Sequence, residues 1–213
     1  MFVKSEPNFN KKDCNLCGLK PDWCLCDQIA PAASKTMISV IIHITEMNRR
    51  SNSGHFAAKC LAKSKVIPYG VPWDKFDHSK LTSGNKKPLL LFPGSENIVS
   101  RSAGDSQKHL VVVDGNWRQA KRMFQKLLRT NEFEWVSLPK ETSGGFALRD
   151  SSMKAGTVST MEAIAIALRE LEGEAIYDHL NSYFNRFVKA HQMARKGLKN
   201  NIRTLCEENA LRI

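Results

Sequence analysis

The sequence predicts an α/β fold in which a mostly parallel sheet is flanked by helices. Short continuous apolar runs at 37–43, 88–92 and 109–113 are typical of strands that a parallel sheet buries on both faces. Segments with helical spacing of apolar residues alternate with these runs, as in α/β proteins. With 213 residues, the chain is long enough for one well-filled core of this class and a small appendage.

The chain is expected to begin with an arm, residues 1–34, that carries four clustered cysteines. Cys14, Cys17, Cys24 and Cys26 follow the spacing C-x2-C-x6-C-x-C. In a reducing compartment this pattern indicates metal ligation before disulfide bonding, because four thiolates can close a tetrahedral site. We therefore expect a knuckle that binds a structural Zn²⁺. Free thiols on a loose arm and an iron–sulfur cluster are the alternatives.

Residues 35–213 are expected to form one α/β domain that opens with a strand and a helix. Residues 37–43 are rich in β-branched side chains and suit a buried strand. A helix is predicted over 53–66, because three apolar residues there follow helical spacing. These residues are Phe56, Cys60 and Leu61.

Proline and glycine mark the ends of the later strands. The strand at 88–92 is stopped by Pro93-Gly94, and a further strand over 133–138 is ended by Pro139. The polar stretch that follows, up to Gly156, is expected to be a loop at the functional site.

Two helices are predicted near the end of the chain. Ser159 and Glu162 fit a capping box that starts the first helix, and Gly173 ends it. The last helix begins at Glu174 and is expected to bury one apolar face before it turns basic. The apolar face comprises Ile176, Leu180, Phe184, Phe187 and Val188, and the basic end comprises Arg195, Lys196, Lys199 and Arg203.

The charge balance favours a polyanionic partner. Lys and Arg outnumber Asp and Glu by 32 to 21, which gives a net charge of +11, and nucleic acid is the leading candidate. No apolar run approaches bilayer length, and the N-terminus lacks the apolar core of a signal peptide. We expect a soluble, cytoplasmic protein without a membrane partner, and nothing indicates an obligate protein partner.

A carboxylate follows the strand at 109–113. Asp114 opens the tetrapeptide Asp-Gly-Asn-Trp, and open α/β folds bind their ligands where strands end. Asp114 can act in chemistry there or merely cap the following helix. Asn116 can also cap that helix, because its side-chain oxygen accepts hydrogen bonds from backbone amides.

The helix after Asn116 is strongly basic. No acidic residue occurs from Trp117 through Asn131, whereas an ordinary exposed helix mixes charges of both signs. This face suits RNA phosphates, although solvated charge is the usual alternative. Trp117 can stack on an RNA base or belong to the core. The cations of this helix are Arg118, Lys121, Arg122, Lys126 and Arg129.

Several short motifs occur in the order seen in DTW-domain proteins, and the chain resembles this family over nearly its whole length. The cysteine spacing also looks like that of bacterial members. Three positions depart from the family pattern: Ile44 replaces a Pro, Ser53 a Thr, and Asn116 the signature Thr. The motifs are His43 to Arg49, Asn52-Ser53-Gly54, Leu91 to Gly94, Asp114 to Ala120, Phe146 to Arg149 and Ser159 to Ala163.

The resemblance implies a transferase that uses S-adenosylmethionine. Family members are similar to aminocarboxypropyltransferases, and bacterial members place the 3-amino-3-carboxypropyl group on a tRNA uridine, typically at position 47 of the variable loop. A related branch that acts on ribosomes has a SPOUT-like fold, which can be knotted. By this resemblance Asp114 is the candidate base for uridine N3 or orients the amino group of the cofactor, and methylthioadenosine is the by-product.

The resemblance and the motifs together assign the remaining site residues. Residues expected at the cofactor are Leu91, Phe92, Pro93, Gly94, Leu138, Ser159 and Thr160. Residues expected at the tRNA are Arg49, Arg50, Asn52, Ser53, Trp117, Arg118, Lys121, Arg122 and Arg149. Two other functions stay open: a SPOUT-like RNA methyltransferase, and a zinc-stabilised RNA-binding protein without catalysis.

Overall fold

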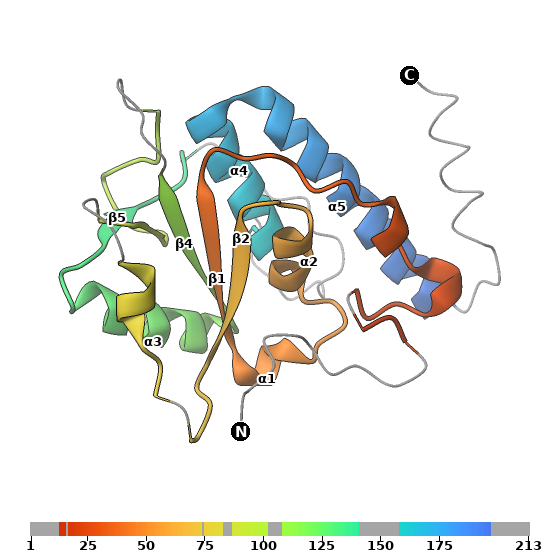
Figure 1. Ribbon diagram of the computed structural model, residues 1–213, viewed down its shortest axis with the longest axis horizontal. Coiled ribbons are helices and arrows are strands. Elements are labelled where there is room, and N and C mark those ends of the chain that lie inside the picture. Colours follow the sequence, from red (N-terminus) through yellow and green to blue (C-terminus); the bar gives the residue numbers. More distant parts are fainter. Residues whose placement is uncertain are drawn as a thin grey trace.

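The computed structural model describes residues 13–15, 17–73, 75–82, 87–101, 108–140 and 158–196. These residues form a five-stranded sheet with the order β2-β1-β4-β3-β5, and every pair of neighbouring strands is parallel (Figure 1). The predicted α/β class with a parallel sheet is confirmed. The strands are β1 (Met37–His43), β2 (Ser64–Tyr69), β3 (Leu89–Leu91), β4 (His109–Asp114) and β5 (Glu134–Val136).

Helices cover both faces of the sheet (Figure 1). Helices α2, α4 and α5 pack on one face, where they share a core with Ile38 and Val40 of β1. Helix α3 packs on the opposite face against Ile41 and Val111. Alternating residues of a strand therefore enter different cores, as the pleat requires. The helices are α1 (Ile44–Met47), α2 (Ser53–Lys59), α3 (Trp117–Leu128), α4 (Thr160–Glu172) and α5 (Glu174–Arg195).

The helix predicted over 53–66 is wrong beyond its first two turns. Helix α2 ends at Lys59, and residues 64–69 form β2 at the edge of the sheet, where among the described residues it pairs with β1 alone. Pro68 lies within β2, opposite Ile42. An edge strand tolerates proline because one side of its backbone makes no ladder hydrogen bonds. Because this strand is short and contains a proline, the periodicity of apolar residues did not predict it.

The predicted helix starts and the predicted face of α5 are confirmed. Asn116 and Gln119 form a capping box at α3, and Ser159 and Glu162 form one at α4. Gly173 ends α4 with φ of 110°, a backbone conformation that favours glycine. In α5, Leu180, Phe184 and Phe187 are buried, whereas Ile176 and Val188 are partly buried. The predicted cations Lys199 and Arg203 lie outside the described residues.

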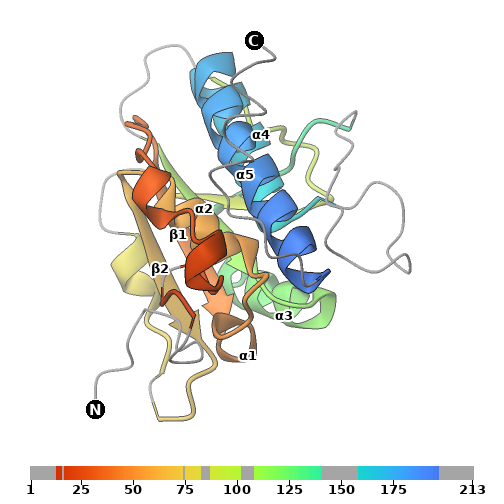
Figure 2. The same ribbon diagram turned by 90° about the vertical axis from the view of Figure 1, so that its right-hand side faces the viewer.

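The N-terminal arm packs along α5 and shares its core (Figure 2). Trp23 and Leu25 are 3% and 1% exposed. The hydroxyl of Tyr183 in α5 accepts a hydrogen bond from the Ala30 amide and donates one to the Gln28 carbonyl, both at 3.0 Å. The boundary at residue 34 stays a prediction. Among the described residues, no helix is both long and apolar enough to cross a membrane.

Candidate active site and cysteine cluster

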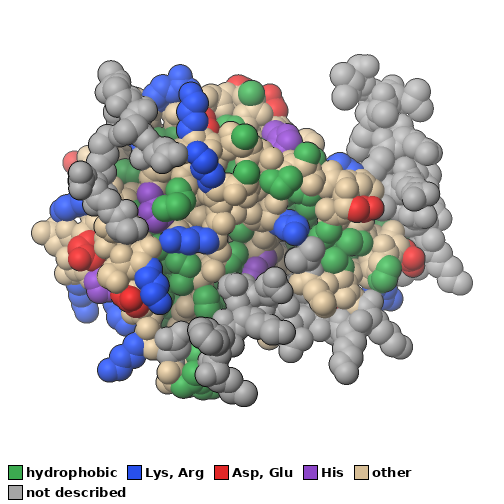
Figure 3. Space-filling view, in the orientation of Figure 1, with side chains coloured by type: hydrophobic (Ala, Val, Ile, Leu, Met, Phe, Trp, Pro, Cys, Tyr) green, Lys and Arg blue, Asp and Glu red, His purple; other side chains and the backbone are tan. Residues whose placement is uncertain are grey.

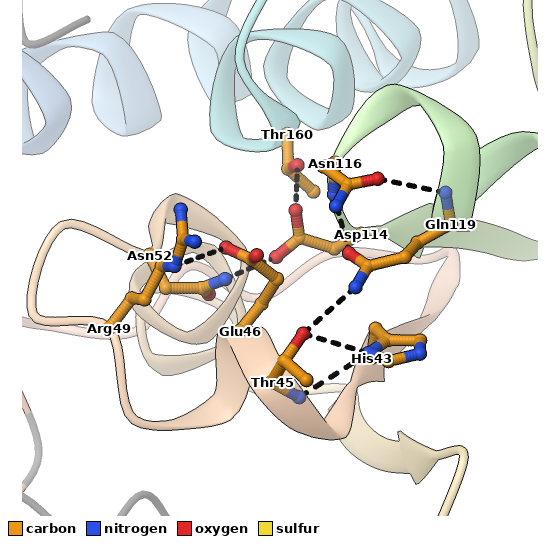
Figure 4. Close-up of polar contacts among 9 residues, drawn as sticks. All are labelled: His43, Thr45, Glu46, Arg49, Asn52, Asp114, Asn116, Gln119 and Thr160. Atoms are coloured by element: carbon orange, nitrogen blue, oxygen red, sulfur yellow. Dashed lines mark hydrogen bonds and ion pairs between the residues drawn. The ribbon is translucent and has the colours of Figure 1, made fainter.

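Asp114 is the last residue of β4 and stands at the carboxyl edge of the sheet, where its side chain is clamped from two sides (Figure 4). Its Oδ2 accepts a hydrogen bond from Asn52 Nδ2 at 2.6 Å, and its Oδ1 accepts one from Thr160 Oγ1 at 2.8 Å. The residue is only 5% exposed. These two hydrogen bonds fix the orientation of the carboxylate. The expectation that Asp114 merely caps α3 is wrong, because Asn116 provides that cap.

The residues Asn52, Ser53 and Gly54 shape the surroundings of Asp114. Asn52 also caps α2, because its Oδ1 accepts a hydrogen bond from the His55 amide at 2.9 Å. Ser53 Oγ accepts one from the Met161 amide of α4 at 3.4 Å. A Cβ atom at Gly54 would lie 2.6 Å from Asp114 Oδ2, so only glycine leaves room for the carboxylate. Asn52 and Ser53 thus have positioning contacts, and their expected contact with tRNA stays a prediction.

A second buried carboxylate, that of Glu46, follows the end of β1. Glu46 of α1 is 8% exposed, and its Oε2 lies 3.1 Å from Arg49 Nε. Figure 4 shows the Glu46 side chain extending toward Asn52 and Asp114. No role was predicted for Glu46 from the sequence. Its position could have indicated a role, because Glu46 lies three residues after the end of β1, and β1 neighbours β4 in the sheet.

A polar network joins α1 to the start of α3 (Figure 4). Gln119 Nε2 donates a hydrogen bond to Thr45 Oγ1 at 2.9 Å, and the same hydroxyl lies 2.9 Å from His43 Nδ1. His43 caps α1 by accepting a hydrogen bond from the Thr45 amide, and burial lowers the pKa of its imidazole. These contacts agree with a structural role for His43.

The residues predicted to bind the cofactor lie at the carboxyl ends of β3 and β5 and at the start of α4. Leu91 and Phe92 are buried, and Pro93 and Gly94 form an exposed turn. The Phe92 carbonyl accepts hydrogen bonds from Trp135 Nε1 at 2.8 Å and from Ser137 Oγ at 2.9 Å, which join the two strand ends. The structure also places the half-buried Leu138, the capping residue Ser159 and Thr160 at this edge.

Trp117 is 65% exposed, so the core role considered for it is wrong. Its ring stacks on Phe92 with centroids 5.4 Å apart, and Phe92 stacks on Phe124 at 4.2 Å. An aromatic column therefore runs from the core to the surface, where the outer face of Trp117 is open to a planar group.

The cations expected at the tRNA have two kinds of surroundings. Arg118, Lys121 and Arg122 are exposed on α3. Figure 3 shows Lys and Arg side chains together with Asp, Glu and His side chains at the lower left of the molecule. Arg49 and Arg50 instead form ion pairs, with Glu46 and with Asp13 of the arm. Arg149 lies outside the described residues, as does the rest of its motif.

The four clustered cysteines converge on one point. The sulfur atoms of Cys14 and Cys26 are 3.7 Å apart, those of Cys17 and Cys24 are 3.8 Å apart, and all four lie within 4.8 Å of one another. Zinc with Zn–S bonds of about 2.3 Å places tetrahedral ligands about 3.8 Å apart. Hydrogen bonding with Cys26 lowers the pKa of the Cys17 thiol to about 5. The donor set and its spacing therefore fit a tetrahedral metal ion.

Comparison with known families decides where the chain belongs. The profile of the DTW domain matches residues 11–192. The chain belongs to the DTW domain family.

Three curated relatives of this DTW-domain protein carry the name tRNA-uridine aminocarboxypropyltransferase 2. The protein from Macaca fascicularis is 27% identical over 176 residues, which are 78% of this chain and 59% of the relative. The Drosophila melanogaster protein is 25% identical over 180 residues, 80% of this chain and 70% of the relative. The Mus musculus protein is 25% identical over 171 residues, 76% of this chain and 57% of the relative. The chain thus spans about three fifths of the length of the macaque and mouse relatives.

A solved structure shares the fold of this DTW domain. The SAM-dependent rRNA:acp-transferase Tsr3 from Vulcanisaeta distributa superposes with a TM-score of 0.51 at 16% identity, covering 79% of this chain and 84% of that one. This likeness agrees with the expected SPOUT-like class. A knot stays a prediction.

The geometry explains how this DTW domain tolerates Asn116 in place of the signature Thr. Asn116 Oδ1 accepts a hydrogen bond from the Gln119 amide at 3.0 Å, and Gln119 Oε1 accepts one from the Asn116 amide at 2.9 Å. The Asn116 side chain caps α3, as a Thr side chain at this position could. Asp114 forms its hydrogen bonds with Asn52 and Thr160, so the substitution concerns the helix cap and not these contacts.

Proposed function

We propose that the protein transfers the 3-amino-3-carboxypropyl group of S-adenosylmethionine to N3 of a tRNA uridine. The observation that carries this proposal is a buried carboxylate, Asp114, at the carboxyl edge of the sheet, next to the helix that presents Trp117 and four exposed cations. Family membership and the names of the three relatives support it.

The proposed chemistry needs a proton acceptor. Uridine N3 attacks the methylene carbon next to the sulfonium, a C–S bond breaks, and methylthioadenosine leaves with the bonding electrons. N3 must lose its proton, because the protonated nitrogen is a weak nucleophile. Asp114 can accept that proton while still bound to Asn52 and Thr160, because each carboxylate oxygen has two lone pairs.

The cofactor is assigned to the same edge of the sheet. Leu91 to Gly94 and Leu138 offer mostly apolar surface for the adenine. The amino-terminal end of α4, near Thr160, suits the methionyl carboxylate, because helix N-termini favour anions.

The tRNA is assigned to the surface of α3. Trp117 can stack on an extruded uracil, as aromatic residues do in RNA recognition. Arg118, Lys121 and Arg122 can neutralise neighbouring phosphates. Position 47 of the variable loop is the proposed target, and Arg149 and the polar loop before Gly156 are proposed to contribute.

The cysteine cluster is assigned a structural zinc ion. A site closed by four thiolates leaves no open position for a substrate, so Zn²⁺ there would stabilise the arm and take no part in the transfer. Cys14, Cys17, Cys24 and Cys26 would hold it.

Product analysis tests the proposed function. The purified protein would be incubated with S-adenosylmethionine and unmodified tRNA, and the digested nucleosides and the by-product identified by mass spectrometry. Aminocarboxypropyluridine with methylthioadenosine is the expected result. A methylated base with S-adenosylhomocysteine would establish a methyltransferase instead, and intact tRNA binding without any product would indicate a non-catalytic RNA-binding protein.

A further inference from the structure

One ion pair connects the cysteine cluster to the loop before α2. Asp13 immediately precedes the ligand Cys14, and its side chain is 3% exposed. Its carboxylate pairs with the guanidinium of Arg50, which is half exposed. A carboxylate this deeply buried depends on its counter-charge, unlike the exposed ion pairs of most protein surfaces. This contact therefore fixes Arg50 to the arm.

The loop that carries Arg50 also carries Asn52, which forms a hydrogen bond with Asp114. The Asn52 amide donates a hydrogen bond to the Arg49 carbonyl at 2.9 Å, which closes a turn around Arg50. Two residues after Arg50, the Asn52 side chain donates to Asp114 Oδ2. A shift of Arg50 would therefore move Asn52 and change one of the two hydrogen bonds that orient the carboxylate.

The arm side of this ion pair is fixed by the cysteine cluster. The Gly18 amide donates to the Cys14 carbonyl at 2.9 Å, and the Cys14 amide donates to the Leu19 carbonyl at 2.7 Å. A metal ion bound to Cys14 would hold the same turn, because its four ligands come from both halves of the arm. The position of Asp13 thus depends on an intact cluster.

Helix α5 encloses the same region. Burial, followed by the charges of Arg195 and Arg50, lowers the pKa of His191 to about 4. Trp23 of the arm, Phe56 of α2 and Phe187 of α5 belong to one buried core.

We propose that the Asp13–Arg50 ion pair transmits the order of the cysteine cluster to the active-site loop at 48–52. Asp13 and Arg50 are then positioning residues for Asp114, and the metal supports the active site without touching it. The proposal rests on the proposed function only in taking Asp114 as the catalytic residue.

Hydrogen exchange in the metal-loaded protein tests the ion pair. Asp13→Asn and Arg50→Gln should each speed exchange in peptides covering 48–58 by about tenfold, through local opening of the loop. The double variant should exchange no faster than either single variant. Arg50→Lys should restore slow exchange, because the pairing needs a positive charge. Slow exchange in Asp13→Asn would overturn the proposal.

Metal removal tests the link to the cluster. Chelation should speed exchange at 48–58 in the wild-type chain and add nothing in Asp13→Asn. An equal acceleration in both chains would show that the cluster acts on the loop by another route and would overturn the proposal. Arg169→Gln, which breaks a distant ion pair with Glu170, is the matched control and should leave this segment unchanged.

Turnover separates this proposal from the proposed function. Asp13→Asn should lower kcat by about tenfold with little change in the KM for S-adenosylmethionine, because a displaced catalytic group affects the chemical step. The exchange experiments give their answer without any catalysis. A protein that forms no aminocarboxypropyluridine would refute the proposed function, while the exchange results would still decide whether the ion pair orders the loop.

Discussion

The cysteine cluster and the Asp114 site are built from residues with very different separations in the sequence. The four cysteine ligands lie between positions 14 and 26, and their sulfur contacts join residues 12 or 7 positions apart. The contacts of Asp114 join residues 62 and 46 positions apart. The first site needs only a local turn, whereas the second needs the whole sheet and two helices.

The two sites should therefore respond differently to substitution. The cluster should respond to the loss of one ligand with a loss of metal and of stability, because binding of the metal orders the arm. The Asp114 site should respond to a small displacement with a loss of rate, while the core keeps the fold intact.

Replacing Asp114 tests the chemical side of this comparison and has the largest expected effect. Asp114→Asn keeps the size of the side chain but cannot accept a proton, so turnover should fall about 1,000-fold. Binding of S-adenosylmethionine and tRNA should persist. Single-turnover release of methylthioadenosine measures the change, with the exposed Asp178→Asn as control. A fully active Asp114→Asn would remove this residue as the base.

Removing one cysteine ligand tests the structural side. Cys26→Ser should release the metal and lower the free energy of unfolding by about 3 kcal/mol, measured by chemical denaturation with the metal content of each sample. Cys60→Ser is the control, because Cys60 lies outside the cluster and the variant should keep the metal. Full metal content in Cys26→Ser would contradict a four-thiolate site.

A single added methyl group tests the sensitivity of the Asp114 site. Gly54→Ala places a Cβ 2.6 Å from Asp114 Oδ2, and the displaced carboxylate should slow turnover about 100-fold. Gly115→Ala adds the same group against Gln119, at 3.0 Å. If both variants slowed turnover equally, the close approach of Gly54 to Asp114 would not explain the loss.

The basic face of α3 should give the smallest of these effects. Replacing Arg118 and Arg122 together with Gln should weaken tRNA binding about tenfold and flatten the slope of log Kd against log salt by about 1.4. The matched control replaces Lys35 and Lys63, which are exposed near the amino ends of β1 and β2. If both double variants lost tRNA affinity equally, α3 would contribute to binding only through its general positive charge.

Much of the fold was predictable because it depends on local rules. Capping boxes at Asn116 and Ser159 are set by residues three positions apart, and apolar runs identify buried strands whatever their partners. The edge strand β2 was missed because Pro68 lies within it and because its residues are all only partly buried, so it contains no continuous apolar run. The sequence left open whether Trp117 lies in the core or at the surface, because helical spacing cannot show where a helix emerges from the core. The structure places Trp117 at the surface.

Spacing within short segments is enough to predict the parallel α/β class, the cysteine cluster and the candidate carboxylate. The groups that surround Asp114, the space that Gly54 leaves for it and the pairing of Arg50 with Asp13 depend on the three-dimensional fold. These contacts join residues that are distant in the chain, and no local propensity or spacing specifies them. They arise from the order of the strands, which brings β1, β4 and the ends of their loops to one edge of the sheet.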